Sequence, residues 1–181
     1  QLKDSGSSAI VILENFAHTL AEVIEHTGVQ RVVMASMGDL LGFWYGRWIT
    51  FAVRHLAKMV PAYDLPLSAG RTLVTFRQAL SDGARRTLTA SSATLDDTAF
   101  LQYTGGTTGL SKGAVLTHRN IVAATLQAEA WFTPALAKMG DVTKANSIAA
   151  LPLYHIFALT LCLLAIRQGS HLTLIPNPRD I

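Results

Sequence analysis

The sequence predicts an α/β fold, a mostly parallel sheet with helices on both faces, because short apolar runs alternate with helical patterns along the chain. Residues 9–35 and residues 148–175 each have the strand, helix and strand spacing of a βαβ unit, which pairs its strands in parallel. Half of the 181 residues are hydrophobic and 15% are charged, so the chain is not disordered. The mean hydropathy of +0.31 leaves two alternatives: strands covered on both faces, or a membrane span.

The first half of the chain begins with one βαβ unit. Ala9–Leu13 is the first expected strand, and Asn15 is expected to cap an amphipathic helix that ends near Gly28. Residues 31–35 are the second expected strand, and helical spacing over residues 46–60 predicts another helix.

A short helix and a polar segment follow. Thr75 is the expected cap of a helix through Leu80, and the composition of residues 81–97 predicts a surface loop. The adjacent carboxylates Asp96 and Asp97 in this loop are interpreted as a solvated turn. The elements expected in the second half are strands at 99–103 and 113–116, a helix over 117–132 capped by Thr117, and a strand, helix and strand at 148–151, 156–167 and 171–175.

The most apolar run, residues 145–166, has no Asp, Glu, Lys or Arg and is long enough to cross a bilayer. Pro152 and His155 count against a span, because both would leave polar groups to be satisfied in lipid. A buried strand, a turn and a buried helix use the same residues at lower cost and are favoured. Membrane insertion stays open as the weaker alternative.

The net charge is +3, and the basic residues are scattered along the chain, so no nucleic-acid partner is expected. The single cysteine, Cys162, excludes an internal disulfide framework and a multi-cysteine zinc site; in its apolar run it is expected to be inert core. The chain begins at Gln1 rather than Met, and both of its ends suggest a piece of a longer protein.

The densest chemical signal is Tyr-Thr-Gly-Gly-Thr-Thr-Gly-Leu-Ser-Lys-Gly-Ala at residues 103–114, after an apolar strand. Glycines let backbone N–H groups approach a ligand closely, threonine hydroxyls add donors, and Lys112 adds a charge, as a polyphosphate site requires. The spacing is neither a Walker A loop nor a dinucleotide-binding turn. From composition alone, a hairpin tip between two strands remains the alternative.

This segment resembles the phosphate-loop signature of the adenylate-forming superfamily, which includes acyl-CoA synthetases, luciferases and peptide-synthetase adenylation domains. Residues 116–120 and 151–158 also fit, the latter resembling the second core motif of the family. The sequences at 99–106 and 177–181 are most similar to those of bacterial long-chain fatty acid CoA ligases. Gly105 and Ser111 depart from the commoner residues of the loop, without removing its glycines or its lysine.

The resemblance implies ATP-dependent activation of a fatty acid to an acyl-adenylate with release of pyrophosphate, then transfer to coenzyme A. It implies that Mg²⁺ assists, with Thr104 as the metal neighbour, and that Lys112 and His155 are catalytic. The implied nucleotide-binding residues are Tyr103, Thr104, Gly105, Gly106, Thr107, Thr108, Gly109, Leu110, Ser111, Lys112, Gly113 and Ala114.

The resemblance also implies that residues 1–181 are part of an N-terminal AMP-binding domain, with a βαβ region and linker at 1–98 and the two motifs at 99–181. The acidic motif, the C-terminal domain and its catalytic lysine would lie outside the chain, so the fragment alone is expected to be inactive. The expected location is the cytoplasm, with peripheral association of the full-length enzyme at the inner face of the cell membrane. Two alternatives stay open: a non-catalytic nucleotide or phosphate-binding module, and another carboxylate-adenylating enzyme of the superfamily.

Overall fold

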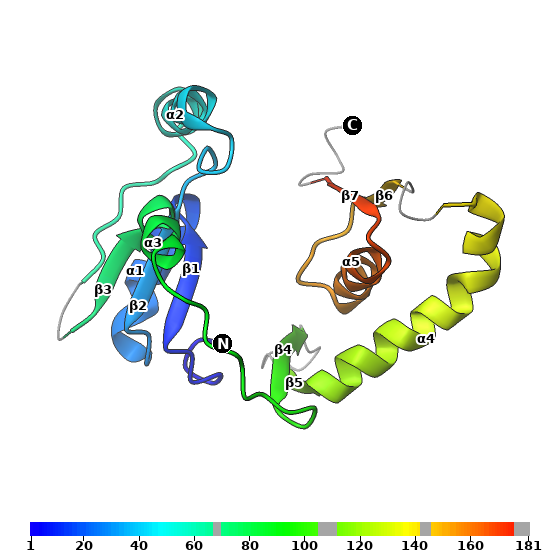
Figure 1. Cartoon of the computed structure of the whole chain (residues 1–181). Helices are drawn as coiled ribbons and strands as arrows, with labels where there is room; N and C mark the ends of the chain where they lie inside the picture. Colours follow the sequence, from blue (N-terminus) through cyan, green and yellow to red (C-terminus); the bar gives the residue numbers. More distant parts are fainter. Residues whose placement is uncertain (67–69, 105–111, 142–145, 176–181) are drawn as a thin grey trace. The chain divides into compact units, whose positions relative to one another are not determined.

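The computed structural model describes residues 1–66, 70–104, 112–141 and 146–175, and the chain divides into two compact units, Gln1–Ala90 and Ser91–Ile181 (Figure 1). The first unit is built on a three-stranded parallel sheet. Its strands are β1 (Ala9–Leu13), β2 (Arg31–Ala35) and β3 (Thr72–Thr75), in the order β1-β2-β3. The first βαβ unit is therefore confirmed, with Ile10 paired to Val32 in parallel register. Strand β3 was not predicted from the sequence.

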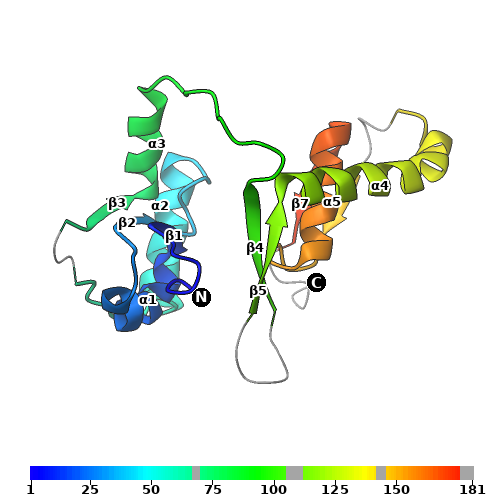
Figure 2. The ribbon, with the colours of Figure 1, turned by 90° about the horizontal axis from the view of Figure 1, so that it is seen from below.

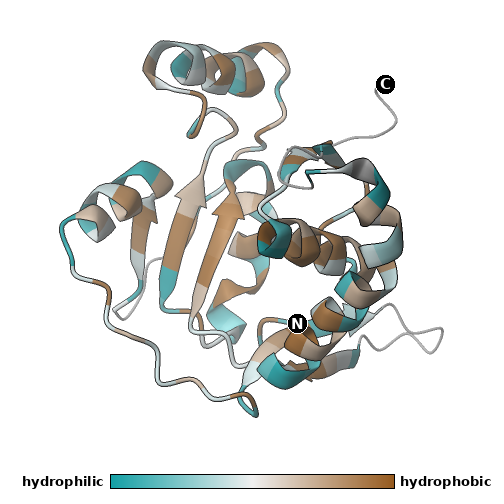
Figure 3. Ribbon diagram, turned by 45° about the vertical axis from the view of Figure 1, so that its right-hand side comes forward, coloured by the Kyte–Doolittle hydropathy of each residue, from teal (hydrophilic) through white to brown (hydrophobic). Residues whose placement is uncertain are grey.

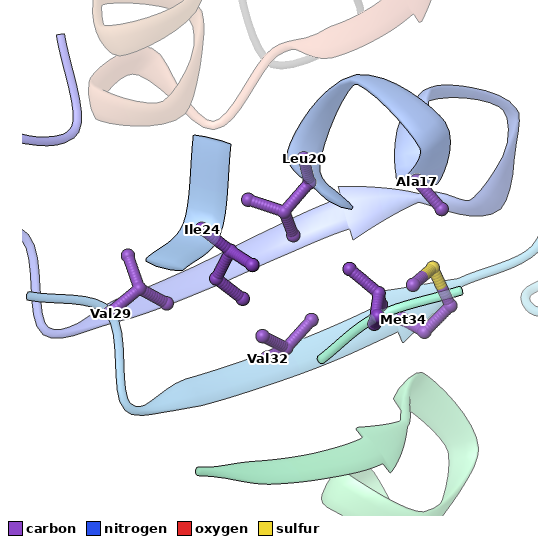
Figure 4. Close-up of a cluster of buried hydrophobic side chains, with 7 residues drawn as sticks. Ala17, Leu20, Ile24, Val29, Val32 and Met34 are labelled. Carbon is purple, nitrogen blue, oxygen red and sulfur yellow. The ribbon is translucent and has the colours of Figure 1, made fainter. Parts of the chain in front are cut away.

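The hydrophobic core of the first unit lies between this sheet and helix α1 (Ala17–Val23), which a 3-10 turn, Ile24–His26, extends. Figure 4 shows side chains of the helical segment above those of β2. Leu20 and Ile24 are fully or almost fully buried there, as is Val32 of the strand. Helix α3 (Phe76–Ala84) lies on the opposite face of the sheet, as Figures 1 and 2 show together. Helices on both faces were predicted.

Asn15 is not the cap that the sequence predicted. A 3-10 turn, Glu14–Phe16, follows β1 directly, and neither this turn nor α1 has a side-chain cap. The Asn15 amide instead donates to the carbonyl of Met59, 3.1 Å away and 44 residues later in the chain. Asn15 is buried, so a contact distant in sequence replaced the local one.

Helix α2 (Phe43–Phe51) begins three residues before the predicted helix and passes into a single π-helical segment, Ala52–Leu56, before its predicted end. One face of α2 is fixed by a close backbone approach. A Cβ at Gly46 would collide with the carbonyl oxygen of Gly38, so glycine is required at this crossing. The opposite side of α2 is exposed and aromatic.

Thr75 caps α3 as predicted, since its hydroxyl accepts a hydrogen bond from the backbone N–H of Gln78 at 3.2 Å. The helix runs to Ala84, four residues beyond its predicted end. The first residues of the predicted surface loop are therefore helical, and regular structure resumes at Thr98.

An ion pair with a buried carboxylate joins the end of β1 to the segment after α2. The Glu14 side chain is 1% exposed, and its Oε2 accepts hydrogen bonds from Nε of Arg54, at 2.8 Å, and from Nη2. The hydrogen bond to Glu14 raises the pKa of Arg54, so the guanidinium keeps its charge. Because a buried carboxylate without a partner is costly, the pair fixes Ala52–Leu56 to the first unit.

The Arg54→Met substitution is expected to lower the free energy of unfolding by about 2 kcal/mol, less than a fully buried pair would cost because Arg54 is half exposed. Urea denaturation of the full-length protein measures this loss. Arg86→Met, at an exposed arginine after α3, is the matched control and should leave stability within about 0.5 kcal/mol. Glu14→Gln combined with Arg54→Met should recover part of the loss, and equal effects of the two single arginine substitutions would contradict the role of the pair.

The second unit begins with an antiparallel hairpin, β4 (Thr98–Thr104) and β5 (Lys112–Thr117). Parallel strands were expected to predominate. The connection between β4 and β5 is too short for a parallel crossover, so these two strands pair in antiparallel. Helix α4 (His118–Leu136) follows at once. Thr117 caps it as predicted, in a reciprocal capping box with Asn120.

The second βαβ unit is confirmed. It consists of β6 (Asn146–Ala149), α5 (Ile156–Gln168) and β7 (His171–Leu174), with parallel strands and with β6 two residues earlier than predicted. Figure 3 shows the strongly apolar character of α5. The described strands thus form three sheets where one was expected.

Residues 146–166 of the apolar run are divided between strand, turn and helix, as the favoured alternative predicted, but the strand is not buried, since Ile148 of β6 is 68% exposed. Cys162 is buried on α5, again as predicted. In the described ranges, no helix combines the length and the apolar character that crossing a membrane needs.

Candidate phosphate-loop site

The hairpin β4/β5 holds both ends of the predicted phosphate loop. Cα pairing runs Tyr103 to Gly113 and Thr104 to Lys112, so the two strands close at the residues that flank the loop. Five predicted nucleotide-binding residues are thereby placed. The others, Gly105, Gly106, Thr107, Thr108, Gly109, Leu110 and Ser111, lie outside the described residues.

The strand register sorts the described residues onto two faces of the hairpin. Side chains alternate along a strand, and directly paired residues of antiparallel strands project from the same face. Thr104 and Lys112 therefore share one face, and Gln102 and Ala114 lie next along it. Thr104 and Lys112 are exposed. A hydroxyl and an ammonium group thus stand together at the entrance of the loop.

The other face carries Tyr103 and Gly113. A Cβ at position 113 would lie 3.0 Å from Cζ of Tyr103 and 3.2 Å from its Cε1 and Cε2. The tyrosine ring therefore covers the backbone of Gly113. The sequence predicted Gly113 as part of the phosphate loop, whereas its geometry shows a packing reason for glycine at this position.

The second motif forms a turn that leads into α5. The backbone N–H of His155 donates to the carbonyl of Pro152 at 2.9 Å, and the carbonyl of His155 accepts the first helical bond, from Leu159. His155 is the N-cap of α5, where its Nδ1 accepts from the N–H of Phe157 at 3.4 Å. The His155 residue is exposed and is not part of the core. With Nδ1 as acceptor, the neutral ring is assigned its proton at Nε2.

A hydrogen bond joins the two motifs. Nε2 of Gln102 donates to the backbone carbonyl of Tyr154 at 2.6 Å, across 52 residues of sequence. Gln102 was not among the predicted site residues. The sequence feature that could have identified Gln102 is its polar amide inside the apolar strand Ala99–Tyr103, on the same face as Thr104.

The carboxylates before β4 lie in an exposed turn, as predicted, and both accept hydrogen bonds. Asp96 accepts two hydrogen bonds from Arg119 of α4, at 2.9 and 3.1 Å. Asp97 accepts from the N–H and the hydroxyl of Thr94, and these bonds lower the pKa of its carboxyl. Both carboxylates therefore have hydrogen-bond partners, which give them a structural role.

Metal ligands are sparse around the hairpin. In the part of the chain that the structure describes, no three His, Cys, Asp or Glu side chains come together to hold an ion. Thr104 supplies one hydroxyl. Such a ligand fits Mg²⁺ only when phosphate oxygens and water complete the coordination.

Each unit contains a pocket. The pocket of the first unit measures about 710 Å³ and opens beside Arg47, Thr50 and Tyr63, without any predicted site residue in its lining. The pocket of the second unit measures about 280 Å³ and lies among α4, α5, β6 and β7. It is mainly apolar, with Ile148, Leu161, Leu164 and Leu172 in its lining.

Comparison with known proteins identifies the family of the chain. The family model described as AMP-binding enzyme matches residues 1–181. The chain belongs to this family. The AMP-binding chain is 47% identical, over 182 residues and all of its length, to a long-chain-fatty-acid–CoA ligase of Salmonella typhimurium. It covers 31% of that protein, so it spans about a third of the length of such curated relatives.

Solved structures agree with the fold of this AMP-binding chain. A long-chain-fatty-acid-CoA ligase of Archaeoglobus fulgidus matches 99% of the chain with 27% of its own, at TM-score 0.54 and 19% identity. The adenylation domain of a carboxylate reductase from Mycobacterium chelonae matches 95% of the chain with 24% of its own, at TM-score 0.64 and 18% identity. At these identities the similarity supports the fold alone.

Proposed function

We propose that this chain is part of a long-chain fatty acid CoA ligase that forms an acyl-adenylate from ATP and a fatty acid, releases pyrophosphate, and passes the acyl group to coenzyme A. The observation that carries the proposal is the 47% identity to curated ligases of that name over the whole chain. Residues 1–181 belong to the N-terminal AMP-binding domain in this proposal. The remaining parts come from the rest of the enzyme, so the fragment alone does not complete the reaction.

Within this function the hairpin face supplies the phosphate contacts. Lys112 balances the charge of the β- and γ-phosphates, while Thr104 and the backbone of residues 105–111 orient them for attack at the α-phosphorus. Mg²⁺, when bound with ATP, neutralises phosphate charge, and the Thr104 hydroxyl is the group of the described residues that would contact it. His155, with a donor at Nε2, is proposed to contact the reacting carboxylate or the α-phosphate.

The acyl chain needs an apolar surface near this site. The pocket of the second unit offers one, because aliphatic side chains of α5 and the adjacent strands line it. Its 280 Å³ are small for a long chain, so the rest of the enzyme would complete the acyl site.

Lys112→Ala in the full-length protein is expected to lower ATP–pyrophosphate exchange roughly 100-fold, because one preorganised charge is lost from the transition state. Lys112→Arg should restore part of the rate, since it keeps the charge. Lys138→Ala, at an exposed lysine after α4, is the control and should leave exchange unchanged. Exchange that is equally fast in the Lys112→Ala variant would remove the lysine from the mechanism.

A non-catalytic nucleotide binder is the competing function, because the hydroxyl of Thr104 and the ammonium group of Lys112 on one hairpin face would serve phosphate binding without catalysis as well. The same assay separates the two. The ligase proposal requires pyrophosphate exchange that depends on a fatty acid. Mg-ATP binding without any exchange in the full-length protein would support the binder instead.

We also propose that the full-length enzyme contacts lipid through α2. Trp44 is 81% exposed and Trp48 60% exposed, and Phe43, Tyr45 and Phe51 are each more than half exposed. Residues 40–63 contain no Asp or Glu but include basic side chains. Tryptophan and tyrosine beside basic groups are typical of helices that lie at a lipid interface.

Replacing both Trp44 and Trp48 by serine is expected to lower co-sedimentation of the full-length protein with phosphatidylglycerol vesicles several-fold, because apolar burial in the interface is lost. Trp131→Ser is the matched control, at an 82% exposed tryptophan of α4. Phosphatidylcholine vesicles should bind the unchanged protein more weakly. Equal sedimentation of all three proteins would contradict a lipid contact through α2.

A further inference from the structure

We propose that Gln102 is a positioning residue, which holds the N-terminus of α5, and with it His155, against the hairpin of the phosphate loop. The inference rests on the proposed ligase function and adds a residue to its site. Its basis is the 2.6 Å hydrogen bond from the Gln102 amide to the Tyr154 carbonyl.

The bonded carbonyl belongs to the peptide unit that leads into the N-cap. The carbonyl of Tyr154 and the N–H of His155 lie in one planar group. Gln102 holds the oxygen of this group, and the carbonyl of Pro152 holds its N–H at 2.9 Å. With both ends fixed, the peptide plane cannot rotate, so the backbone of His155 starts from a defined direction.

The N-cap geometry passes this direction to the imidazole. His155 is extended, with φ −86° and ψ 131°, and its Nδ1 accepts from the N–H of Phe157. A rotation of the preceding peptide would carry the imidazole away from this bond. The Tyr154 side chain is 79% exposed, so Tyr154 contributes through its backbone carbonyl.

The hairpin register connects this contact to the loop. Gln102, Thr104 and Lys112 project from one face, and Thr104 lies two residue steps along the strand from Gln102, about 7 Å away. The hydrogen bond therefore fixes the distance between the N-terminus of α5 and the phosphate contacts. A neutral amide does this without adding charge beside a polyphosphate, whereas a carboxylate would repel both the carbonyl and the nucleotide.

The test compares Gln102→Met, which keeps the length of the side chain but removes the donor, with Gln102→Glu in the full-length enzyme. The control is Gln78→Met, which removes a similar amide hydrogen bond, 2.9 Å to Asp82, from α3. Pyrophosphate exchange gives kcat and the KM for ATP, and a thermal midpoint reports folding. Lys112→Ala is measured beside them.

We expect Gln102→Met to lower kcat roughly tenfold with a change in the KM for ATP below about twofold, because misplacement of a reacting group affects the rate more than ground-state binding. Gln102→Glu should lower kcat further and raise the KM for ATP. Gln78→Met should leave both constants unchanged, and the thermal midpoints of all three variants should stay close to that of the unchanged enzyme.

Unchanged kcat in Gln102→Met would overturn the inference, as would a loss of kcat that the loss of folded protein explains completely. If Gln102→Met does not fold, the kcat of Gln102→Glu decides instead. An unchanged kcat in that variant would overturn the inference, and a lowered kcat in folded protein would support it. Absence of exchange in the unchanged enzyme is a different result, because it would overturn the ligase proposal itself.

Discussion

The antiparallel pairing of β4 with β5 is the constraint on which the candidate site depends. It joins Thr104 to Lys112 across the ends of the loop and places both on one face with Gln102. From that face the Gln102 amide donates to the carbonyl of Tyr154 in the turn before α5. Had the pairing slipped by one residue, every side chain would change face, and Gln102 would point away from the carbonyl that it binds. The register thus decides which groups can meet at the loop.

Long-range polar contacts fix the ends of helical segments in both units. In the first, buried Glu14 at the end of β1 binds Arg54 beyond α2. In the second, Gln102 binds the peptide that precedes α5. The two contacts differ energetically. The ion pair stabilises because its loss would leave a buried charge, whereas the amide bond is neutral and exposed, so its main effect is on geometry.

The sequence predicted the features whose signal is local. Thr75 and Thr117 were identified as caps because capping joins residues three apart, and β1 and β2 followed from apolar runs of strand length. Asn15 was misassigned because its partner lies 44 residues away. β3 is only four residues long and follows a proline-containing segment, so no periodic pattern marked it. Gln102 acquires its meaning only from a partner 52 residues later, which no local pattern could supply.

The central claim is that the hairpin face with Lys112 holds the phosphates of ATP. An ATP derivative whose terminal phosphate carries a reactive acyl group tests it directly, because the acyl group passes to a lysine amine within reach of that phosphate. Peptide mass spectrometry of the labelled full-length protein should find the acyl group on Lys112, and excess Mg-ATP should prevent the labelling. Labelling confined to other lysines, with Lys112 unmodified, would contradict the claim.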